Sequence, residues 1–320
     1  MPRSIIRYAD KGVARWGVIF DQYIAPLDIQ VQTTGELVSL HWDLLWSTRA
    51  EQASVHHASV KLLSPVTTNQ QFLCLGVSYR SHVEESGLDI ADFPFITVFT
   101  KASSCITAAD APVVRPPHVQ LLDYEIELGL VLRRDLPAGT VVRPDDLGDW
   151  LAGITIVNDL SARDIQLPQG QFYKGKSFRG FGPVGPTLVL LREEEWVRWP
   201  ALHMHLAVNG QTRQDAYCAE LIHGPAPTLT ELASVHDVNA GDLISTGTPA
   251  GCAARAPSKV IRFFARHFMS DAAKWRMFIK RGRKNLAYLR PGDRISATIR
   301  TDDGVIDLGE QTTTITSLRG

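Results

Sequence analysis

The sequence predicts an α+β fold that is mostly β, and three observations support this prediction. The apolar segments of the chain are short, as strands are. Pro and Gly residues interrupt the chain between these segments, which is typical of turns. Long segments with apolar residues at helical spacing are few.

Residues 1–65 are expected to form a small β-rich N-terminal domain. Residues 16–20 and 23–27 are short apolar segments separated by a polar break, which predicts two strands. Residues 41–57 have the character of a helix. The end of this domain is placed near Pro65.

Residues 66–320 are expected to form one larger domain, in which apolar segments are denser. Residues 124–132 alternate acidic and apolar side chains before becoming continuously apolar, as a strand that enters a core does. The segments predicted as strands are 72–77, 95–99, 124–132, 150–157, 188–191, 202–208, 243–246, 294–299 and 311–315.

The composition is that of a globular protein, with 44% hydrophobic and 21% charged residues. A formal net charge of −1 gives no reason to expect a nucleic acid partner. The four cysteines lack the spacing of a zinc ribbon or a redox pair, which fits a reducing compartment. Residues 1–20 lack the apolar centre of a signal peptide, and no apolar run approaches the roughly 18 residues of a membrane span. We expect a cytoplasmic protein without a membrane span.

Three acidic residues form the candidate metal site. Glu125 and Glu127 flank Ile126, and residues i and i+2 of a strand project from the same face. Asp159 follows a second apolar segment where the chain turns. Buried carboxylates repel one another unless a cation lies between them, and their hard oxygens suit Mg²⁺, Mn²⁺ or Ca²⁺. From the spacing alone, an exposed strand edge and a helix cap at Asp159 remain the competing interpretation.

Seven ordered blocks then resemble the fumarylacetoacetate hydrolase superfamily. The first contains Tyr79 and His82, the third is Asp123-Tyr124-Glu125-Ile126-Glu127-Leu128, and the fourth matches N-D-x-S-A-R-D-x-Q. The blocks span residues 76–82, 101–104, 123–128, 158–166, 175–178, 209–214 and 241–251. Their order over residues 72–253, with a further match from Tyr288, makes chance similarity implausible.

The resemblance implies a mixed β-sandwich roll, usually a homodimer, with Mg²⁺ or a similar ion. The metal ligands of the family fall on Glu125, Glu127 and Asp159. Its substrates are acylpyruvates, fumarylacetoacetate, oxaloacetate and related keto acids. Its members include C–C bond hydrolases, decarboxylases and isomerases.

The resemblance also suggests the catalytic residues. His82 is the expected general base, and Glu85 lies one helical turn away, where a carboxylate would orient the imidazole. Glu84 is the competing choice, although residue i+2 faces elsewhere on a helix. Lys176 lies in a block matching G-K-S-F and is expected to contact an oxyanion or carboxylate. Without the resemblance, a surface histidine and a solvated lysine would be the simpler interpretations.

Four residues are expected to bind substrate. Tyr79 and Gln166 are candidate pocket residues, Arg163 either binds substrate or orients Asp159, and Thr248 lies in a glycine-rich loop that permits close backbone approach. Several positions depart from the pattern of the family and leave the substrate open. They are Ser78, Ala102, Arg179, Cys252 and Ala253.

The largest departure is a basic insertion at about residues 254–287, expected to be helical. Residues 257–290 carry ten Lys or Arg residues and one acid, Asp271, together with several aromatic residues. A helical pair packed on the domain or across a dimer interface is the favoured interpretation. An interfacial membrane helix and a basic entrance for an anionic substrate are the alternatives.

The predicted function is metal-dependent hydrolysis of a C–C bond in an acylpyruvate or 1,3-diketo acid, with water activated by His82. An oxaloacetate-type decarboxylase or a keto-enol isomerase on the same scaffold is the alternative. A non-catalytic protein that binds partners through the basic insertion is the alternative of another class.

Overall fold

The computed structural model describes residues 1–92, 94–255 and 269–318. The basic insertion is therefore described at its two ends, and residues 256–268 of it lie outside the described residues. No helix in the described ranges is long and apolar enough to cross a membrane.

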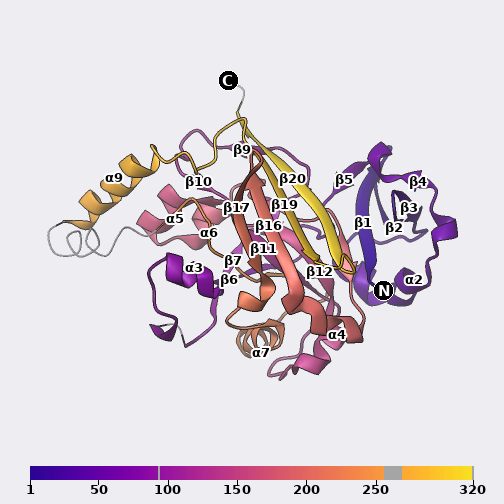
Figure 1. Ribbon diagram of the computed structural model, residues 1–320. Helices are drawn as coiled ribbons and strands as arrows, with labels where there is room; N and C mark the ends of the chain where they lie inside the picture. Colours follow the sequence, from indigo (N-terminus) through magenta and orange to yellow (C-terminus); the bar gives the residue numbers. More distant parts are fainter. Residues whose placement is uncertain (93, 256–268, 319–320) are drawn as a thin grey trace.

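A large mixed sheet forms the centre of the fold (Figure 1). Its strands follow the order β4-β3-β2-β1-β15-β12-β11-β18-β6-β7, and β5 pairs with β1. Their bounds are β1 (Arg3–Asp10), β2 (Val13–Phe20), β3 (Tyr23–Pro26), β4 (Val55–His56), β5 (Lys61–Leu63), β6 (Phe72–Gly76), β7 (Thr97–Lys101), β11 (Ile126–Leu132), β12 (Leu151–Asn158), β15 (Leu188–Leu190) and β18 (Leu243–Ser245).

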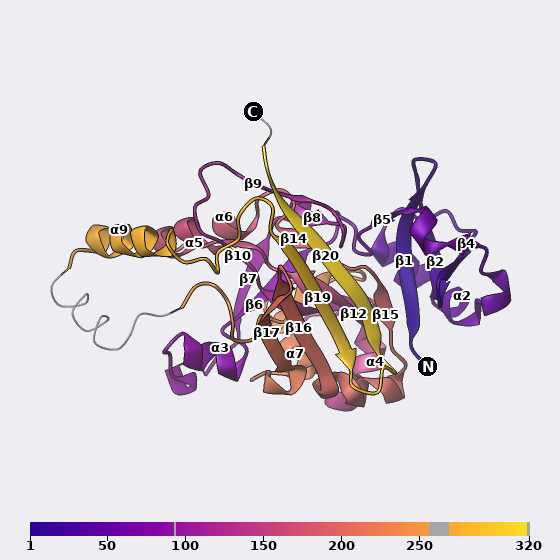
Figure 2. The same ribbon diagram turned by 45° about the horizontal axis from the view of Figure 1, so that its top comes forward.

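A second sheet of five strands packs on the first (Figure 2). Its order is β17 (Gln211–Tyr217), β16 (Leu202–Val208), β19 (Arg294–Thr301), β20 (Asp307–Ser317) and β9 (Val113–Arg115). Leu128 and Leu130 of β11 share one hydrophobic cluster with Leu206 of β16 and Ile299 of β19. Two short pairs complete the strands: β10 (Leu122–Asp123) with β13 (Ser161–Ala162), and β8 (Ile106–Thr107) with β14 (Gly182–Pro183).

The helices are short and lie at the edges of the sheets (Figure 1). The α-helices are α1 (Thr34–Leu40), α2 (Trp42–Ser47), α3 (Arg80–Glu85), α4 (Leu147–Trp150), α5 (Arg163–Gln169), α6 (Phe172–Lys176), α7 (Pro225–Val235) and α9 (Asp271–Gly282). The 3₁₀ turns are η1 (Ala50–Gln52), η2 (His57–Ser59), η3 (Ile90–Asp92), η4 (Ser103–Cys105), η5 (Pro144–Asp146), η6 (Glu193–Ala201) and η7 (Cys218–Glu220).

The predicted α+β, mostly β fold is confirmed. The helix expected over residues 41–57 is wrong in its extent, because α2 ends at Ser47 and Val55–His56 is strand β4. Helix α1 was not predicted, although the sequence contains a signal for it. This signal is a capping box, in which Thr33 and Glu36 satisfy each other's backbone amides. The polar strand β17 was also not predicted, because few of its side chains are buried.

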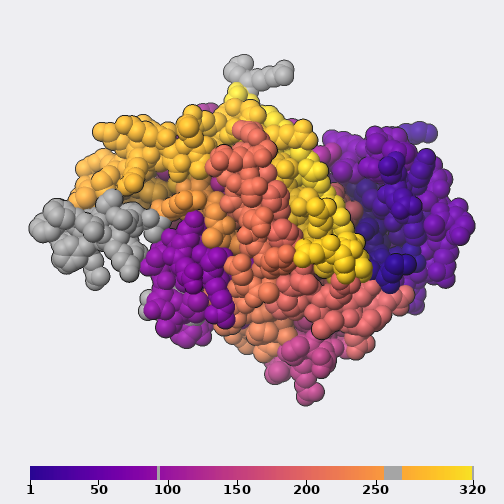
Figure 3. Space-filling model, viewed as in Figure 1, coloured from indigo at the N-terminus to yellow at the C-terminus, as the bar shows by residue number. Residues whose placement is uncertain are grey.

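The N-terminal strands are continuous with the central sheet rather than separate from it. β1 pairs with β15, and Ile5 and Trp16 share a hydrophobic cluster with Phe72 and Leu243. Figure 3 shows the indigo N-terminal region packed closely against the rest of the molecule. A domain boundary near residue 65 stays a prediction, since the two parts share both hydrogen bonds and core.

Candidate active site

The three carboxylates meet because β11 and β12 are paired in antiparallel register. Ile126 lies opposite Asn158, which brings Glu125 and Glu127 beside Asp159. The Asp159 amide donates to Glu125 O at 2.8 Å, and the Glu125 amide donates to Asn158 Oδ1 at 3.1 Å. One oxygen from each carboxylate lies within 4.8 Å of the other two. All three side chains are buried, so this is not an exposed strand edge.

Glu127 carries the strongest sign that a cation belongs in this cluster. Its Oε2 accepts from Ser245 Oγ at 2.5 Å and from the Gly247 amide at 2.9 Å. Among the described residues, no basic side chain lies within ion-pair distance of it. Burial and then the charge of Asp159 raise the pKa of Glu127 to about 8. Three hard carboxylates with one uncompensated acid fit a divalent cation such as Mg²⁺.

Two buried lysines balance the other two carboxylates. Lys176 donates to both Glu125 and Asp159. Lys101 donates to Asp159 Oδ1 at 2.5 Å and to the Phe181 carbonyl at 2.7 Å. Burial opposes the charge on Lys176, but Asp159 and Glu125 outweigh it and raise its pKa. Lys176 therefore remains an ammonium group in the centre of the site.

Arg163 holds the acidic cluster from one side. Its guanidinium donates to Asp123 Oδ2 at 2.8 Å, to Glu125 Oε1 at 2.5 Å and to Gln166 Oε1 at 2.8 Å. Asp123 also accepts from the amides of Ala253 and Ala254, at 2.7 and 3.0 Å. All three nitrogens of Arg163 thus bond to protein groups, and the residue positions Glu125.

His82 lies on α3 and lines the same cavity as Glu125 and Glu127. Its Nδ1 is buried and has no hydrogen-bond partner among the described residues. Burial lowers the pKa of His82 more than Glu125 raises it, which favours the neutral imidazole. Glu85 accepts from the Gly251 amide at 2.8 Å and lies 3.3 Å from Arg255 Nε. The structure therefore brings His82 to the site without a described Glu85–His82 hydrogen bond.

These groups line a cavity of about 950 Å³. Glu125, Glu127, His82, Arg163, Gln166, Lys176 and Thr248 are all on its wall. The Thr248 hydroxyl donates to the Ile126 carbonyl at 2.9 Å and accepts from Gln214 at 2.8 Å, which fixes the glycine-rich loop. Tyr79 is not among the lining residues, because its hydroxyl points into the core toward Met204 Sδ at 3.1 Å.

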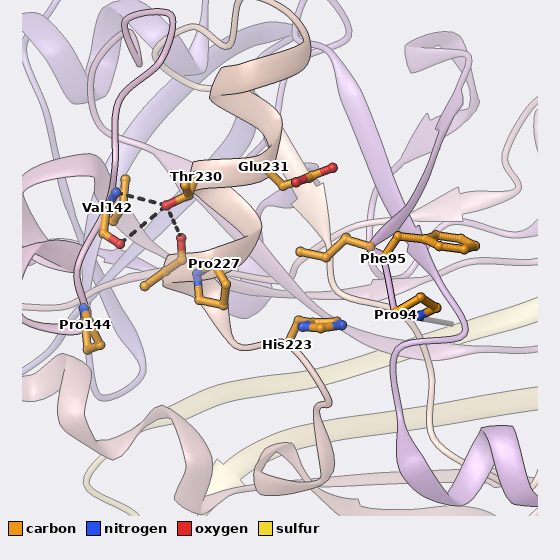
Figure 4. A pocket seen from close by; sticks show the side chains of 10 residues that line it. Pro94, Phe95, Val142, Pro144, His223, Pro227, Thr230 and Glu231 are labelled. Atoms are coloured by element: carbon orange, nitrogen blue, oxygen red, sulfur yellow. Dashed lines mark hydrogen bonds between the residues drawn. The ribbon is translucent and has the colours of Figure 1, made fainter. Parts of the chain in front are cut away.

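A second hollow lies elsewhere on the surface (Figure 4). It has a volume of about 560 Å³ and lies between the loop at Pro94 and Phe95 and the start of α7. Thr230 closes one side of it by hydrogen bonding to Val142. Its lining residues include none of the residues that line the acidic cavity.

Sequence reasoning matched Lys101 and Asp123 to motifs but gave them no role, and it expected Gly247 only to permit close backbone approach. The structure shows that Lys101 neutralises Asp159, Asp123 fixes Arg163, and Gly247 donates to Glu127. Ser245 was missed as well, although it follows an apolar segment at a strand end. An apolar strand that ends in a small polar residue was the available signal for it.

Replacing Gly247 with Ala should destabilise the protein by about 3 kcal/mol or more. Gly247 has φ +84°, and an added Cβ would collide with Ser78 Oγ. Gly12 has the same φ of +84° with nothing within 4 Å, so Gly12→Ala should cost only about 1 kcal/mol. Urea unfolding of both variants measures the difference, and equal losses would show that the close approach does not matter.

Replacing Glu127 with Gln should remove the stabilisation of the protein by Mg²⁺ without destabilising the metal-free form. The folded pKa of Glu127 is raised, so its favourable contribution is present below the unfolded pKa and is lost as pH rises through about 8. At pH 8 the metal-free Glu127→Gln protein should therefore unfold at a temperature equal to or above that of wild type. Thermal scans with Mg²⁺ test the loss of stabilisation by the metal, and scans with a chelator test the stability of the metal-free form. A rise in unfolding temperature with Mg²⁺ that is retained in the variant would exclude Glu127 as a ligand.

Comparison with known proteins identifies the family to which most of this chain is similar. Residues 71–316 match the family model "Fumarylacetoacetate (FAA) hydrolase C-terminal". Oxaloacetate tautomerase YisK of Bacillus subtilis is 35% identical over 199 residues, covering 61% of this chain and 64% of that protein. An uncharacterized protein of Methanocaldococcus jannaschii is 32% identical over 181 residues, covering 57% of this chain and 72% of that one.

Among solved structures, fumarylacetoacetate hydrolase from Exiguobacterium antarcticum has a TM-score of 0.75 and 27% identity. That similarity covers 98% of this chain and 99% of the other. The family model covers most of the chain, and the acidic trio lies within it. The chain therefore belongs to the fumarylacetoacetate hydrolase family.

Proposed function

We propose that this protein is a metal-dependent hydrolase that cleaves a C–C bond in an acylpyruvate or another 1,3-diketo acid. The observation that carries the proposal is that His82 lines the same cavity as Glu125 and Glu127, which cluster with Asp159. His82 is half-buried there with its Nδ1 buried, and its lowered pKa keeps the imidazole neutral and able to accept a proton. A histidine placed in this way is suited to remove a proton from water beside the carboxylates.

The acidic trio would hold the metal. Glu125, Glu127 and Asp159 are hard oxygen ligands, so Mg²⁺ is the expected ion, with Mn²⁺ and Ca²⁺ as alternatives. When bound, such an ion would act as a Lewis acid on the keto oxygen of the substrate. Ser245 and Gly247 orient Glu127, and Arg163 orients Glu125.

The chain's own groups supply the remaining chemistry. The Lys176 ammonium lies on the cavity wall, where it stabilises negative charge that develops on the substrate. Gln166 lines the same cavity and accepts from Arg163 through Oε1, which leaves its amide nitrogen without a hydrogen-bond partner in the described part of the chain and able to donate to a substrate. Thr248 also lines the cavity, and its hydroxyl is engaged by Gln214 and the Ile126 carbonyl.

A second candidate is interconversion of the keto and enol forms of an oxaloacetate-like acid. The relative at 35% identity is an oxaloacetate tautomerase, which favours this reaction. Tautomerisation needs a group that takes and returns a proton, and His82 could do this without Glu85 as its orienting partner. Decarboxylation of the same acid is a further alternative, since it needs no attacking water.

A panel of acylpyruvates and oxaloacetate, each assayed with Mg²⁺, separates these reactions. Release of pyruvate and a free carboxylic acid from an acylpyruvate would establish the hydrolase. Accelerated decay of enol absorbance with oxaloacetate intact would establish the tautomerase, and CO₂ release would establish the decarboxylase. If no keto acid reacts and calorimetry detects no metal binding, the enzyme proposal fails and the basic insertion becomes the candidate binding surface.

A further inference from the structure

The described end of the insertion forms one wall of the active-site cavity. Residues Lys274, Trp275, Met277, Phe278, Arg281 and Lys284 line the cavity, and they are named the insertion wall here. Their spacing follows one face of α9 and continues just beyond its end at Gly282. Both ribbon views place α9 on the same side of the molecule as α5 and α6, which carry Arg163 and Lys176 (Figures 1 and 2).

The C-terminal end of α9 is docked against the catalytic domain. Gly282 is buried, and a Cβ there would meet the Leu121 side chain at 2.6 Å. Phe278 packs against the main hydrophobic cluster. Arg283 Nε donates to Gln120 Oε1 at 2.5 Å, and Asn285 Nδ2 donates to the Ala253 carbonyl at 3.1 Å. The insertion wall is therefore held next to the segment that leads to Asp123.

The charges in the cavity are unequal in number. Among the residues that the structure describes, its wall carries six Lys or Arg side chains and two carboxylates, which are Glu125 and Glu127 of the metal site. Two of the basic groups outside the metal site have acidic partners: Lys274 lies 3.0 Å from Asp271, and Arg255 lies 3.3 Å from Glu85. In the parts of the chain that the structure describes, Arg281 and Lys284 have no carboxylate within ion-pair distance.

Burial separates the cavity into an inner and an outer end. Glu125, Glu127 and Lys176 are at most 3% exposed, whereas Arg281 and Lys284 are exposed. Apolar side chains from several elements line the same cavity, among them Phe99, Phe172, Met277 and Phe278. A volume of about 950 Å³ is near the upper end of typical ligand pockets, which is more than a four-carbon acid fills.

We propose that Arg281 and Lys284 bind a second carboxylate of the substrate, distant from the metal. The inference rests on the proposed function, which places the keto acid head at the acidic trio. The substrate class is then a keto diacid whose two ends are separated by an apolar segment. The insertion acts as a specificity element, because it offers two cations that have no acidic partner among the described residues where the second carboxylate would lie.

The test compares a 2-keto monoacid with a 2-keto diacid of the same carbon number. Neither carries the second keto group that C–C hydrolysis requires, so binding is measured without turnover. Isothermal calorimetry with Mg²⁺-loaded protein should show that the diacid binds about tenfold more tightly than the monoacid. In the double variant Arg281→Gln and Lys284→Gln, that preference should disappear while the affinity for the monoacid stays unchanged.

The matched control is Arg276→Gln with Lys280→Gln. Both are exposed on α9, neither lines the cavity, and the pair removes the same charge from the same helix. The control should keep the diacid preference. Equal affinities in wild type, a preference retained in the Arg281/Lys284 variant, or no binding of either acid would overturn the inference. A diacid preference in a protein that fails to cleave acylpyruvates would count against the hydrolase proposal alone.

Discussion

His82→Gln is expected to lower kcat by a factor of about 10²–10⁴, the usual contribution of a positioned acid or base. His82 lies on the wall of the cavity with Glu125, and its Nδ1 has no hydrogen-bond partner among the described residues. Gln occupies a similar volume but cannot take up a proton. Because His82 is not a ligand in the acidic trio, Mg²⁺ affinity should stay unchanged. Steady-state kinetics and calorimetric Mg²⁺ titration measure the two quantities separately.

Glu85→Gln is the informative companion to this variant. The Glu85 carboxylate bonds to the Gly251 amide, and an amide oxygen can keep that contact. We expect a loss in kcat much smaller than that of His82→Gln. A comparable loss would show that Glu85 orients the imidazole during the reaction, as the sequence suggested. Full activity of His82→Gln itself would remove His82 from the mechanism.

The sequence predicted the strands better than the helices, for a physical reason. A strand such as Leu202–Val208 alternates buried apolar residues with His203 and His205 before it becomes apolar, and this pattern is visible without the partner strands. Helix α1 begins at a capping box, and both α1 and α2 depend on packing in the N-terminal cluster, where Leu37, Val38 and Leu45 are fully buried. Strand β17 is polar and forms because it pairs with β16 at the edge of its sheet, a contact that no local pattern reveals.

The acidic trio could be found from sequence through its motifs, whereas its balance of charge could not. The spacing of Glu125 and Glu127 indicates a shared face but does not show that Lys176 lies between Glu125 and Asp159. Lys101 is 58 positions from Asp159, and only the sheet order brings them together. Tyr79 shows that a matched motif residue need not reach the cavity. Its motif was expected to place it in the substrate pocket, but its hydroxyl lies in the core beside Met204 Sδ.

The basic insertion shows where composition stops being informative. Its charge and aromatic residues were compatible with a packed helix, a membrane helix and a basic entrance. The choice among these three interpretations depends on where α9 docks. The close approach of Gly282 to the Leu121 side chain places its C-terminal end against the domain. The packed helix and the basic entrance then prove compatible, since one face of α9 lines the cavity while its end is packed on the domain.

Asp159→Asn should be the most destabilising single change at the site, at about 3–5 kcal/mol in the metal-free protein. Asp159 is fully buried and pairs with Lys101 and Lys176. The Lys101 side chain is 0% exposed, so removing its partner leaves a buried charge without compensation. The variant should also lose the Mg²⁺-dependent rise in unfolding temperature. Urea unfolding in a chelator and thermal scans with Mg²⁺ provide the two measurements.

Asp164→Asn is the matched control, five residues further along the chain. Asp164 is buried and accepts from the amides of Gln120 and Leu121, at 2.8 and 3.2 Å, without a described ion pair. Its replacement should cost about 1 kcal/mol and leave the response to Mg²⁺ intact. The contrast with Glu127→Gln is sharper, because the same change of carboxylate to amide should there leave the metal-free protein as stable or more stable. A loss of metal-free stability in both Asp159→Asn and Glu127→Gln would contradict this assignment of charges. In that case Lys101 and Lys176 would not neutralise Asp159 selectively.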